Sequence, residues 1–203
     1  MHRAARSRAG HVCLLAGILL LCAAAGLIVY NTWQSARAGA AAQSALAKLT
    51  DALSSQMREE AQDAEAARER PAASASLEVE GYRYTGIVSI PALGLELPVM
   101  EDWNERNLRV APCRYAGSAG GGDLVIAGHN YRSHFGPLRT LDIGSAVSFY
   151  SAAGVAYDYV VDGVELLAPW QVSEMTCGDW DLTLFTCTTS GDARVAIRCV
   201  RSS

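Results

Sequence analysis

The sequence predicts an all-β domain, a sandwich or a barrel, that follows an N-terminal membrane helix and a helical stalk. Three observations lead to this prediction: an uncharged apolar run near the N-terminus, a long stretch of helix-forming residues, and a series of short strand patterns from residue 77 onward. At 203 residues, the chain has room for one ordinary domain plus extensions. Its net charge of −4 gives no indication of a nucleic-acid partner.

The first segment is a candidate signal anchor. Residues 12–30 form a run of 19 residues without charge, and about 20 apolar residues span a bilayer as a helix. Arg3, Arg6 and Arg8 precede the run and no acid does, which predicts a cytoplasmic tail over 1–11 and an extracellular remainder. A cleaved signal peptide is the alternative, but the run exceeds the usual signal core of about 7–15 residues. We therefore expect a single-pass protein of the cell membrane, held in the lipid bilayer by residues 12–30.

Residues 31–76 are expected to form a helical stalk and a linker. The stretch between Ala40 and Glu69 lacks Gly and Pro and is rich in helix formers. A thin apolar stripe recurs at spacings of three and four, through Leu46, Leu49, Leu53 and Met57. Because the stripe fades after Met57, we expect a solvated spacer; a partner helix or short coiled coil is the alternative. The sequence "PAASAS" then breaks the helix.

Residues 77–203 carry the strand patterns. Runs such as "YRYTGIVSI", "DLVIAG", "DLTLFTC" and "RVAIRCV" alternate with turn signals such as "GSAGGGD". Several short strands at this spacing predict a β-sandwich or barrel of about 125 residues. Short helical turns are expected at "WNERNLRV" and "FGPLRTLD".

Two residues at strand ends are candidates for chemistry. Cys187 ends the strand "DLTLFTC", next to the polar turn "TTSGDA", where another molecule can reach it. A reactive thiolate needs a positive neighbour or a base. His129 also follows a strand, just after a glycine that allows close backbone approach. His134 lies in a polar loop, and we expect it to be a surface or hydrogen-bonded histidine.

The remaining cysteines and acids suggest structural roles. The four cysteines of the domain could form two disulfides. If Cys187 is free, Cys113, Cys177 and Cys199 can form at most one. Cys199 shares a strand face with the apolar residues of "RVAIRCV", which predicts a buried thiol. The cysteine spacing is not that of a zinc knuckle. Three acidic residues, Glu101, Asp102 and Glu105, are expected to lie in a solvated loop and not to form a calcium site. No metal or cofactor is expected.

Three motifs in order carry a resemblance to a family. "TLFTC" and "IAGHN", followed by the arginine of "GDARVAIR", resemble the signatures of sortases, the membrane-anchored cysteine transpeptidases of Gram-positive bacteria. The resemblance covers about Gly81 to Arg201 and agrees with the predicted anchor, stalk and β-domain. It implies an eight-stranded β-barrel with short loop helices as the catalytic domain over 77–203.

The resemblance also implies a reaction. Cys187 would attack a carbonyl in the C-terminal sorting signal of a surface protein and retain the acyl group as a thioester. His129 would act as general acid and base, and Arg194 would donate hydrogen bonds to the substrate carbonyl and oxyanion. An amine, typically on a peptidoglycan precursor or on a pilin, would resolve the thioester.

Two arginines compete for that last role. Arg194 and Arg198 are four apart, so on a strand they point to the same side, about 13 Å from each other. The short connection between Cys187 and Arg194 predicts an antiparallel hairpin in which these two face each other across its mouth. Arg194 is therefore the predicted catalytic arginine.

The subclass and two other function classes stay open. The stretch "GHNYRSHFGPL" is similar to class B sortases, but the long helical insertion of that class is missing before the cysteine strand. A pilus-assembling sortase is the second choice, since neither an aromatic lid nor a C-terminal membrane segment is evident. A secreted cysteine peptidase of another fold would use water as acceptor. A tethered β-domain without catalysis would hold Cys187 in a disulfide or on zinc.

Overall fold

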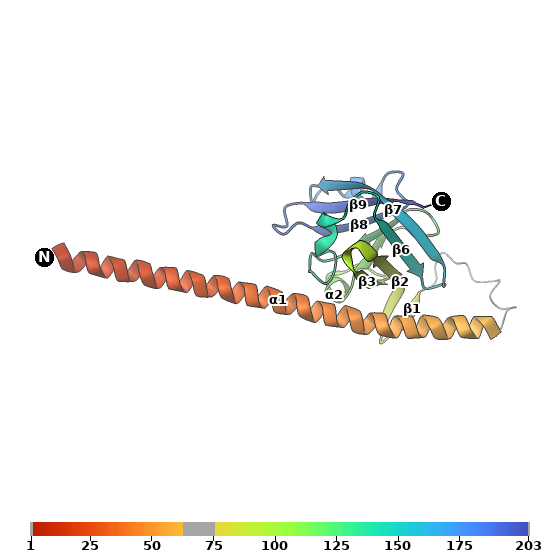
Figure 1. Cartoon of the computed structure of the whole chain (residues 1–203), viewed down its shortest axis with the longest axis horizontal. Helices are drawn as coiled ribbons and strands as arrows, with labels where there is room; N and C mark the ends of the chain where they lie inside the picture. The colour runs from red at the N-terminus through yellow and green to blue at the C-terminus, as the bar shows by residue number, and fades with distance from the viewer. Residues whose placement is uncertain (1, 63–75, 203) are drawn as a thin grey trace. The chain divides into compact units, whose positions relative to one another are not determined.

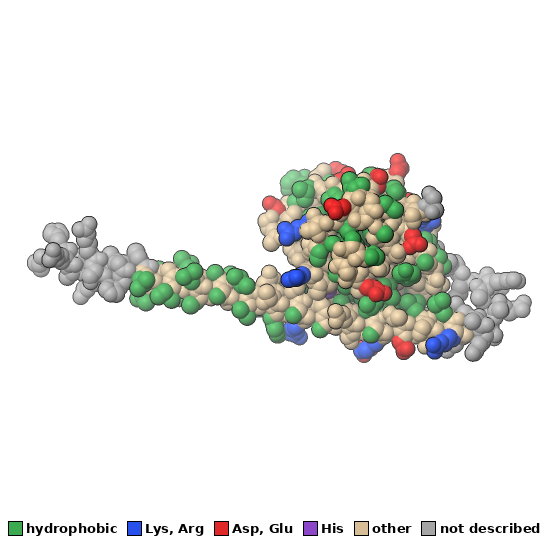
Figure 2. All heavy atoms as spheres, in the orientation of Figure 1, with side chains coloured by type: hydrophobic (Ala, Val, Ile, Leu, Met, Phe, Trp, Pro, Cys, Tyr) green, Lys and Arg blue, Asp and Glu red, His purple; other side chains and the backbone are tan. Residues whose placement is uncertain are grey.

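The computed structural model describes residues 2–62 and 76–202, which form two compact units, Met1–Arg37 and Ala38–Ser203. Helix α1 (His2–Gln62) supplies all of the described part of the first unit. Its apolar side chains from Leu14 to Tyr30 are exposed along the helix (Figure 2). The helix from Leu14 to Arg58 is long and apolar enough to cross a membrane and is a candidate anchor. The predicted linker 71–76 lies almost entirely outside the described residues.

The second unit contains a closed β-barrel (Figure 1). The sheet order is β1-β2-β3-β4-β5-β8-β9-β7-β6, and an additional β2–β6 pairing closes the ring. Eight strands make the barrel, as predicted, and β1 adds a short ninth strand to the edge of β2. The strands are β1 (Leu77–Val79), β2 (Tyr82–Ile90), β3 (Leu95–Met100), β4 (Cys113–Ala116), β5 (Leu124–Ala127), β6 (Ala146–Ser151), β7 (Ala156–Leu167), β8 (Leu182–Cys187) and β9 (Arg194–Arg201).

Short helices lie in the connections between strands. Those predicted from sequence are present as α2 (Glu105–Leu108) and η3 (Gly136–Thr140). Two more are η2 (Pro91–Leu93) and α3 (Val172–Thr176). The β7–β8 connection contains only the five-residue helix α3, which agrees with the absence of a long helical insertion from the sequence.

Alternation along β8 and β9 separates the inside of the barrel from its outside. Leu182 and Leu184 of β8 pack in the main core with Ile197 and Cys199 of β9, all of them fully buried. Successive side chains of a strand point to opposite faces. Phe185 and Cys187 therefore lie on the outer face of the barrel, and this is the face on which the candidate site is built.

The stalk differs from the favoured prediction of a solvated spacer. Leu49 of α1 is fully buried and packs with Tyr84, Met100 and Cys113 of the barrel. Leu46 and Leu53 pack against the same cluster, whereas Met57 remains 56% exposed. The apolar stripe from Leu46 to Leu53 is therefore a docking face for the β-domain, because residues at helical spacing lie on one side of the helix.

The cysteines with described side chains are all free: Cys22, Cys113, Cys177, Cys187 and Cys199. Cys113 and Cys199 are fully buried in different clusters and form no disulfide, which confirms the predicted burial of Cys199. Burial raises the pKa of each of these two thiols to about 12. The acidic loop forms ion pairs, since Glu101 lies 3.2 Å from Arg83 and Asp102 lies 2.9 Å from the same guanidinium.

Candidate active site

Two parallel strands bring His129 and Cys187 to the same edge of the barrel. β5 and β8 pair in register, with Ala127 opposite Phe185, so the residues that follow, 129 and 187, lie beside each other. The Gly128 amide donates to the Phe185 carbonyl over 3.0 Å. The Thr186 hydroxyl donates to the Gly128 carbonyl over 2.8 Å. These bonds fix the two strand ends against each other.

Gly128 is needed for this close approach. A Cβ atom at this position would lie 2.5 Å from Cδ2 of Phe135, which is fully buried under the loop that follows β5. Any other residue would displace the Phe135 ring or the strand end. The predicted need for a glycine immediately before His129 is therefore explained by contact with Phe135.

A further bond spans the two loops beyond the strand ends. The Asn130 Nδ2 group donates to the Thr188 carbonyl over 3.1 Å. Bonds from Gly128 and Asn130 therefore bracket His129, and their acceptors bracket Cys187 in the same way. Asn130 was not selected from the sequence as a site residue. It stands in the quoted motif "IAGHN", and this was the signal available.

The antiparallel hairpin of β8 and β9 places Arg194 directly opposite Cys187. Both side chains are half-buried and belong to the outer face, as do the pairs Phe185–Ala196 and Thr183–Arg198 further along the ladder. The Arg194 Nη1 group donates to the carbonyl of Ala193 over 3.2 Å and to that of Gly191 over 3.4 Å. Cys187 thus has a guanidinium side chain as its cross-strand neighbour.

Arg198 has a different environment although it shares this face. It is 2% exposed, and its guanidinium donates to Glu165 over 2.9 Å, to the Thr183 hydroxyl over 3.0 Å and to the Met175 carbonyl over 3.2 Å. The Glu174 carbonyl accepts a further bond. All three guanidinium nitrogens are used in joining β9 to β7, β8 and the α3 segment, which is a structural environment.

The ring of His129 is supported by Tyr131. The two ring centroids are 4.6 Å apart with an interplanar angle of 29°, which is a stacked arrangement. The Nε2 atom of His129 is buried and has no hydrogen-bond partner among the described residues. Burial lowers the pKa of His129, with a smaller opposing effect from Glu105 and a smaller lowering effect from Arg109.

His134 is neither on the surface nor hydrogen-bonded, contrary to the prediction. It is fully buried, and both ring nitrogens lack a partner among the described residues. Its ring lies 5.5 Å from that of Tyr131. Burial lowers the pKa of His134 to about 4; the backbone of Ala38 opposes this effect, and the charge of His129 adds to it. A polar loop sequence gave no signal for this burial.

The β8–β9 loop is ordered by its own side chains. The Thr188 hydroxyl donates to Asp192 over 2.8 Å and accepts from the Ala193 amide over 3.1 Å, while Ser190 also donates to Asp192. Gly191 adopts φ +78°, which favours glycine. Bonds from Ser190 and then Thr188 lower the pKa of Asp192. This network fixes the turn that carries Cys187 into Arg194.

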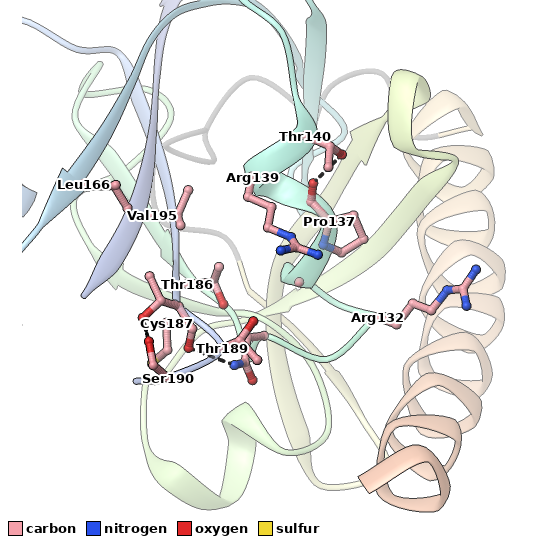
Figure 3. A pocket seen from close by; sticks show the side chains of 13 residues that line it. Arg132, Pro137, Arg139, Thr140, Leu166, Thr186, Cys187, Thr189, Ser190 and Val195 are labelled. Carbon is pink, nitrogen blue, oxygen red and sulfur yellow. Dashed lines mark hydrogen bonds between the residues drawn. The ribbon is translucent and has the colours of Figure 1, made fainter. Parts of the chain in front are cut away.

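A cavity of about 740 Å³ opens beside Cys187 (Figure 3). One wall is formed by the end of β8 and its loop, and the other by Asn130, Arg132 and the η3 segment. His129 and Arg194 do not line it. The cavity therefore adjoins the thiol, and the arginine and the stacked histidine form no part of its walls.

Three residue types that can serve covalent acyl transfer lie at these strand ends: a half-buried thiol, an imidazole and, across the hairpin, a guanidinium. The strand register places the three predicted site residues at neighbouring strand ends, whereas Arg198 is buried in a hydrogen-bond network and His134 is buried in the loop. Among the described residues, no group of three or more His, Cys, Asp or Glu side chains could hold a metal ion.

Comparisons with known proteins agree with this architecture. The sortase domain family model matches residues 88–202. Sortase A from Bacillus anthracis is 33% identical over 127 residues, which are 59% of each chain, so the match spans less than two thirds of that relative.

Two solved structures have similar folds. Sortase A from Corynebacterium diphtheriae matches with a TM-score of 0.55 and 22% identity, over 60% of this chain and 62% of that one. Sortase C1 from Streptococcus agalactiae matches with a TM-score of 0.54 and 26% identity, over 63% and 72%. Because the family model covers more than half of the chain, this protein belongs to the sortase family.

Proposed function

We propose that this protein is a cysteine transpeptidase that cleaves a C-terminal sorting signal and transfers the acyl fragment to an amine. The observation that carries the proposal is the alignment of His129, Cys187 and Arg194 on three neighbouring strand ends. Structural ion pairs do not account for Arg194 as they do for Arg198. Membership of the sortase family supports the same reaction class.

In the first half-reaction the Cys187 thiolate attacks the scissile carbonyl carbon. Arg194 stabilises the negative charge that develops on the carbonyl oxygen. The C–N bond then breaks, protonated His129 gives its proton to the departing amine, and the acyl group stays on sulfur as a thioester. Stacking by Tyr131 restricts the imidazole to one orientation, which favours transfer along a fixed direction.

In the second half-reaction an amine attacks the thioester carbon. The C–S bond breaks, the new amide leaves, and the proton lost by the amine returns to His129, which restores the starting pair. Two half-reactions of this kind replace one difficult amide exchange. We propose a cell-wall precursor as the source of the amine. A pilin is the second candidate, for which the likeness to sortase C1 of Streptococcus agalactiae is the supporting observation.

We further propose that residues 12–30 anchor the chain in the cell membrane with the barrel outside. Leu14 to Tyr30 expose apolar side chains along the helix, and the three arginines before them favour a cytoplasmic N-terminus. Added protease should degrade the barrel of intact wall-stripped cells. Complete protection until lysis would contradict this orientation.

The reaction is tested with the full chain in detergent, because α1 contributes Leu49 to the core of the β-domain. The protein is incubated with sorting-signal peptides, with and without an amine, and intact mass is measured. We expect an acyl adduct on Cys187, and a transpeptidation product only when the amine is present. Equal consumption of peptide without any amine-linked product would favour a hydrolytic peptidase. Absence of an adduct with every peptide, and of alkylation at Cys187, would favour a domain without catalysis.

A further inference from the structure

The cavity beside Cys187 has an unusual charge for this protein. Arg132 and Arg139 are its charged lining residues, and the rest of the lining is neutral. The chain as a whole carries −4. Thr140, Thr188 and Ser190 contribute hydroxyl groups to the same lining. A cavity of this composition favours a ligand with an anionic group and additional hydrogen-bonding groups.

Arg139 is the cation that faces the site. Figure 3 shows its guanidinium pointing from η3 into the space before Thr186 and Cys187, whereas Arg132 points away from the thiol. No ion pair or hydrogen bond to a described residue occupies the Arg139 guanidinium, and its side chain is exposed. Arg83, Arg114 and Arg198, in contrast, each pair with a carboxylate. A free planar fork of donors is suited to binding a carboxylate through two parallel hydrogen bonds.

Strand parity assigns the cavity to one side of the reaction. Arg194, on the outer face, is placed to hold the acyl carbonyl, so the acyl fragment lies over that face. The cavity is lined by Cys187 and by Thr186 and Val195, whose side chains point to the other face of the strands, whereas Arg194 does not line it. It therefore adjoins the opposite side of the thioester. The amine leaves on this side, and the acceptor enters on the same side because both half-reactions pass through similar intermediates.

We propose that this cavity is the acceptor subsite and that its acceptor is an amine that also carries a carboxylate, which Arg139 binds. The inference rests on the proposed transpeptidase function. The positive potential disfavours a protonated amine beside it, which increases the fraction of neutral, nucleophilic amine. The carboxylate offsets the same potential and positions the acceptor. In the leaving fragment of a sorting signal, the residue after the scissile bond is joined to the next residue by a peptide bond. Its backbone therefore has no free carboxylate for Arg139 to bind.

The test compares acceptors that differ in the carboxylate and have amines of similar basicity. Diglycine is paired with diglycinamide, and Nα-acetyl-lysine with its amide. The full chain in detergent is acylated by a sorting-signal peptide, and the ratio of aminolysis to hydrolysis is measured for each acceptor. We expect the carboxylate form to be preferred about tenfold in at least one pair, the scale of a charge-assisted hydrogen bond. Arg139→Gln should reduce this preference to about one.

Arg132→Gln is the matched control, since it removes the same charge from the same rim while its side chain points away from the thiol. It should retain most of the preference. Equal use of both members of each pair by the unmodified protein, or an undiminished preference in Arg139→Gln, would overturn the proposal. Donor peptides with Glu or Gln after the scissile bond are compared in the same way. If Arg139→Gln changes only the acylation rate of the Glu peptide, then Arg139 binds an anion of the donor, and the proposal is overturned. Failure to acylate Cys187 at all would instead count against the transpeptidase itself.

Discussion

The ring of Tyr131 stacks on the ring of His129, with centroids 4.6 Å apart, and thereby connects the candidate base to the packing of its own loop. The Tyr131 ring also lies 5.5 Å from the buried ring of His134. Ser133, between these residues, approaches Gly39 of α1 so closely that a Cβ on Gly39 would lie 2.8 Å from the Ser133 Cβ. The histidine loop is therefore packed between the barrel and the docked part of the stalk.

Replacing Tyr131 should slow acylation without preventing it. An aromatic pair of this kind contributes about 1 kcal/mol, so Tyr131→Ala should lower the single-turnover acylation rate by about fivefold. Tyr131→Phe retains the stacked ring and should recover most of the rate, which a purely destabilising effect would not explain. The rates should be compared at a temperature where circular dichroism shows all three proteins folded. A Phe variant as slow as the Ala variant would contradict a role through stacking.

The two arginines of β9 should give opposite results. Arg194→Ala should lower the acylation rate by two or more orders of magnitude, the scale of a lost oxyanion donor, and leave thermal stability nearly unchanged. Arg194→Lys should also fail largely, because an ammonium lacks the planar fork. Arg198→Ala should keep most of the activity per folded molecule but reduce the free energy of unfolding by about 2–3 kcal/mol, since it removes a buried guanidinium together with its hydrogen bonds to Thr183 and Met175. The reverse pattern would show that Arg198 is the catalytic arginine.

Alkylation should separate the cysteines by burial. In the native protein, iodoacetamide should label Cys187, and also Cys177, which is exposed. Cys113 and Cys199 are fully buried with pKa values raised to about 12, so both should remain unlabelled until the protein is denatured. Tandem mass spectrometry locates the label. Labelling of Cys199 in the native state with none on Cys187 would contradict the assignment of the nucleophile.

Much of the site could be predicted from sequence because it lies at the ends of regular strands. Period-two alternation and short turns determine which residues of β8 and β9 oppose each other, and this is why Cys187 and Arg194 were matched correctly. The apolar run "DLVIAG" likewise determines where His129 emerges. These features depend on local patterns, which a single sequence carries directly.

The features that sequence reasoning missed depend on contacts between distant segments. A solvated spacer and a docked helix can have the same apolar stripe through Leu49. The two cases differ only in whether an apolar surface of the barrel lies against the stripe, and that surface is formed by distant residues. The burial of His134 and the stacking of Tyr131 follow from the course of an irregular loop, in which no periodicity fixes side-chain direction. The free guanidinium of Arg139 depends on where η3 lies relative to β8.

The docked stalk should contribute to the stability of the β-domain. Leu49→Ala removes a fully buried side chain and should lower the free energy of unfolding by about 2–5 kcal/mol, measured by urea denaturation of the full chain in detergent. Met57→Ala is the control on the same helix, because that side chain is largely exposed and should cost at most about 0.5 kcal/mol. Equal, small effects of both substitutions would mean that the helix does not dock in solution.

The buried His134 should make stability depend on pH. Its pKa is about 4 in the folded protein, against about 6.5 when unfolded, so between these values the unfolded chain binds more protons. The free energy of unfolding should therefore fall as the pH is lowered from about 6.5 to 4, by about 3 kcal/mol in total from this residue. His129, whose pKa is also lowered by burial, contributes in the same direction and remains in every variant.

His134→Leu should consequently show a shallower loss of stability over this range, and His134→Phe provides a second apolar replacement if packing around leucine is poor. Urea denaturation at several pH values between 4 and 7 measures the difference in slope. Parallel curves for the original chain and both variants would show that folding does not lower the pKa of His134.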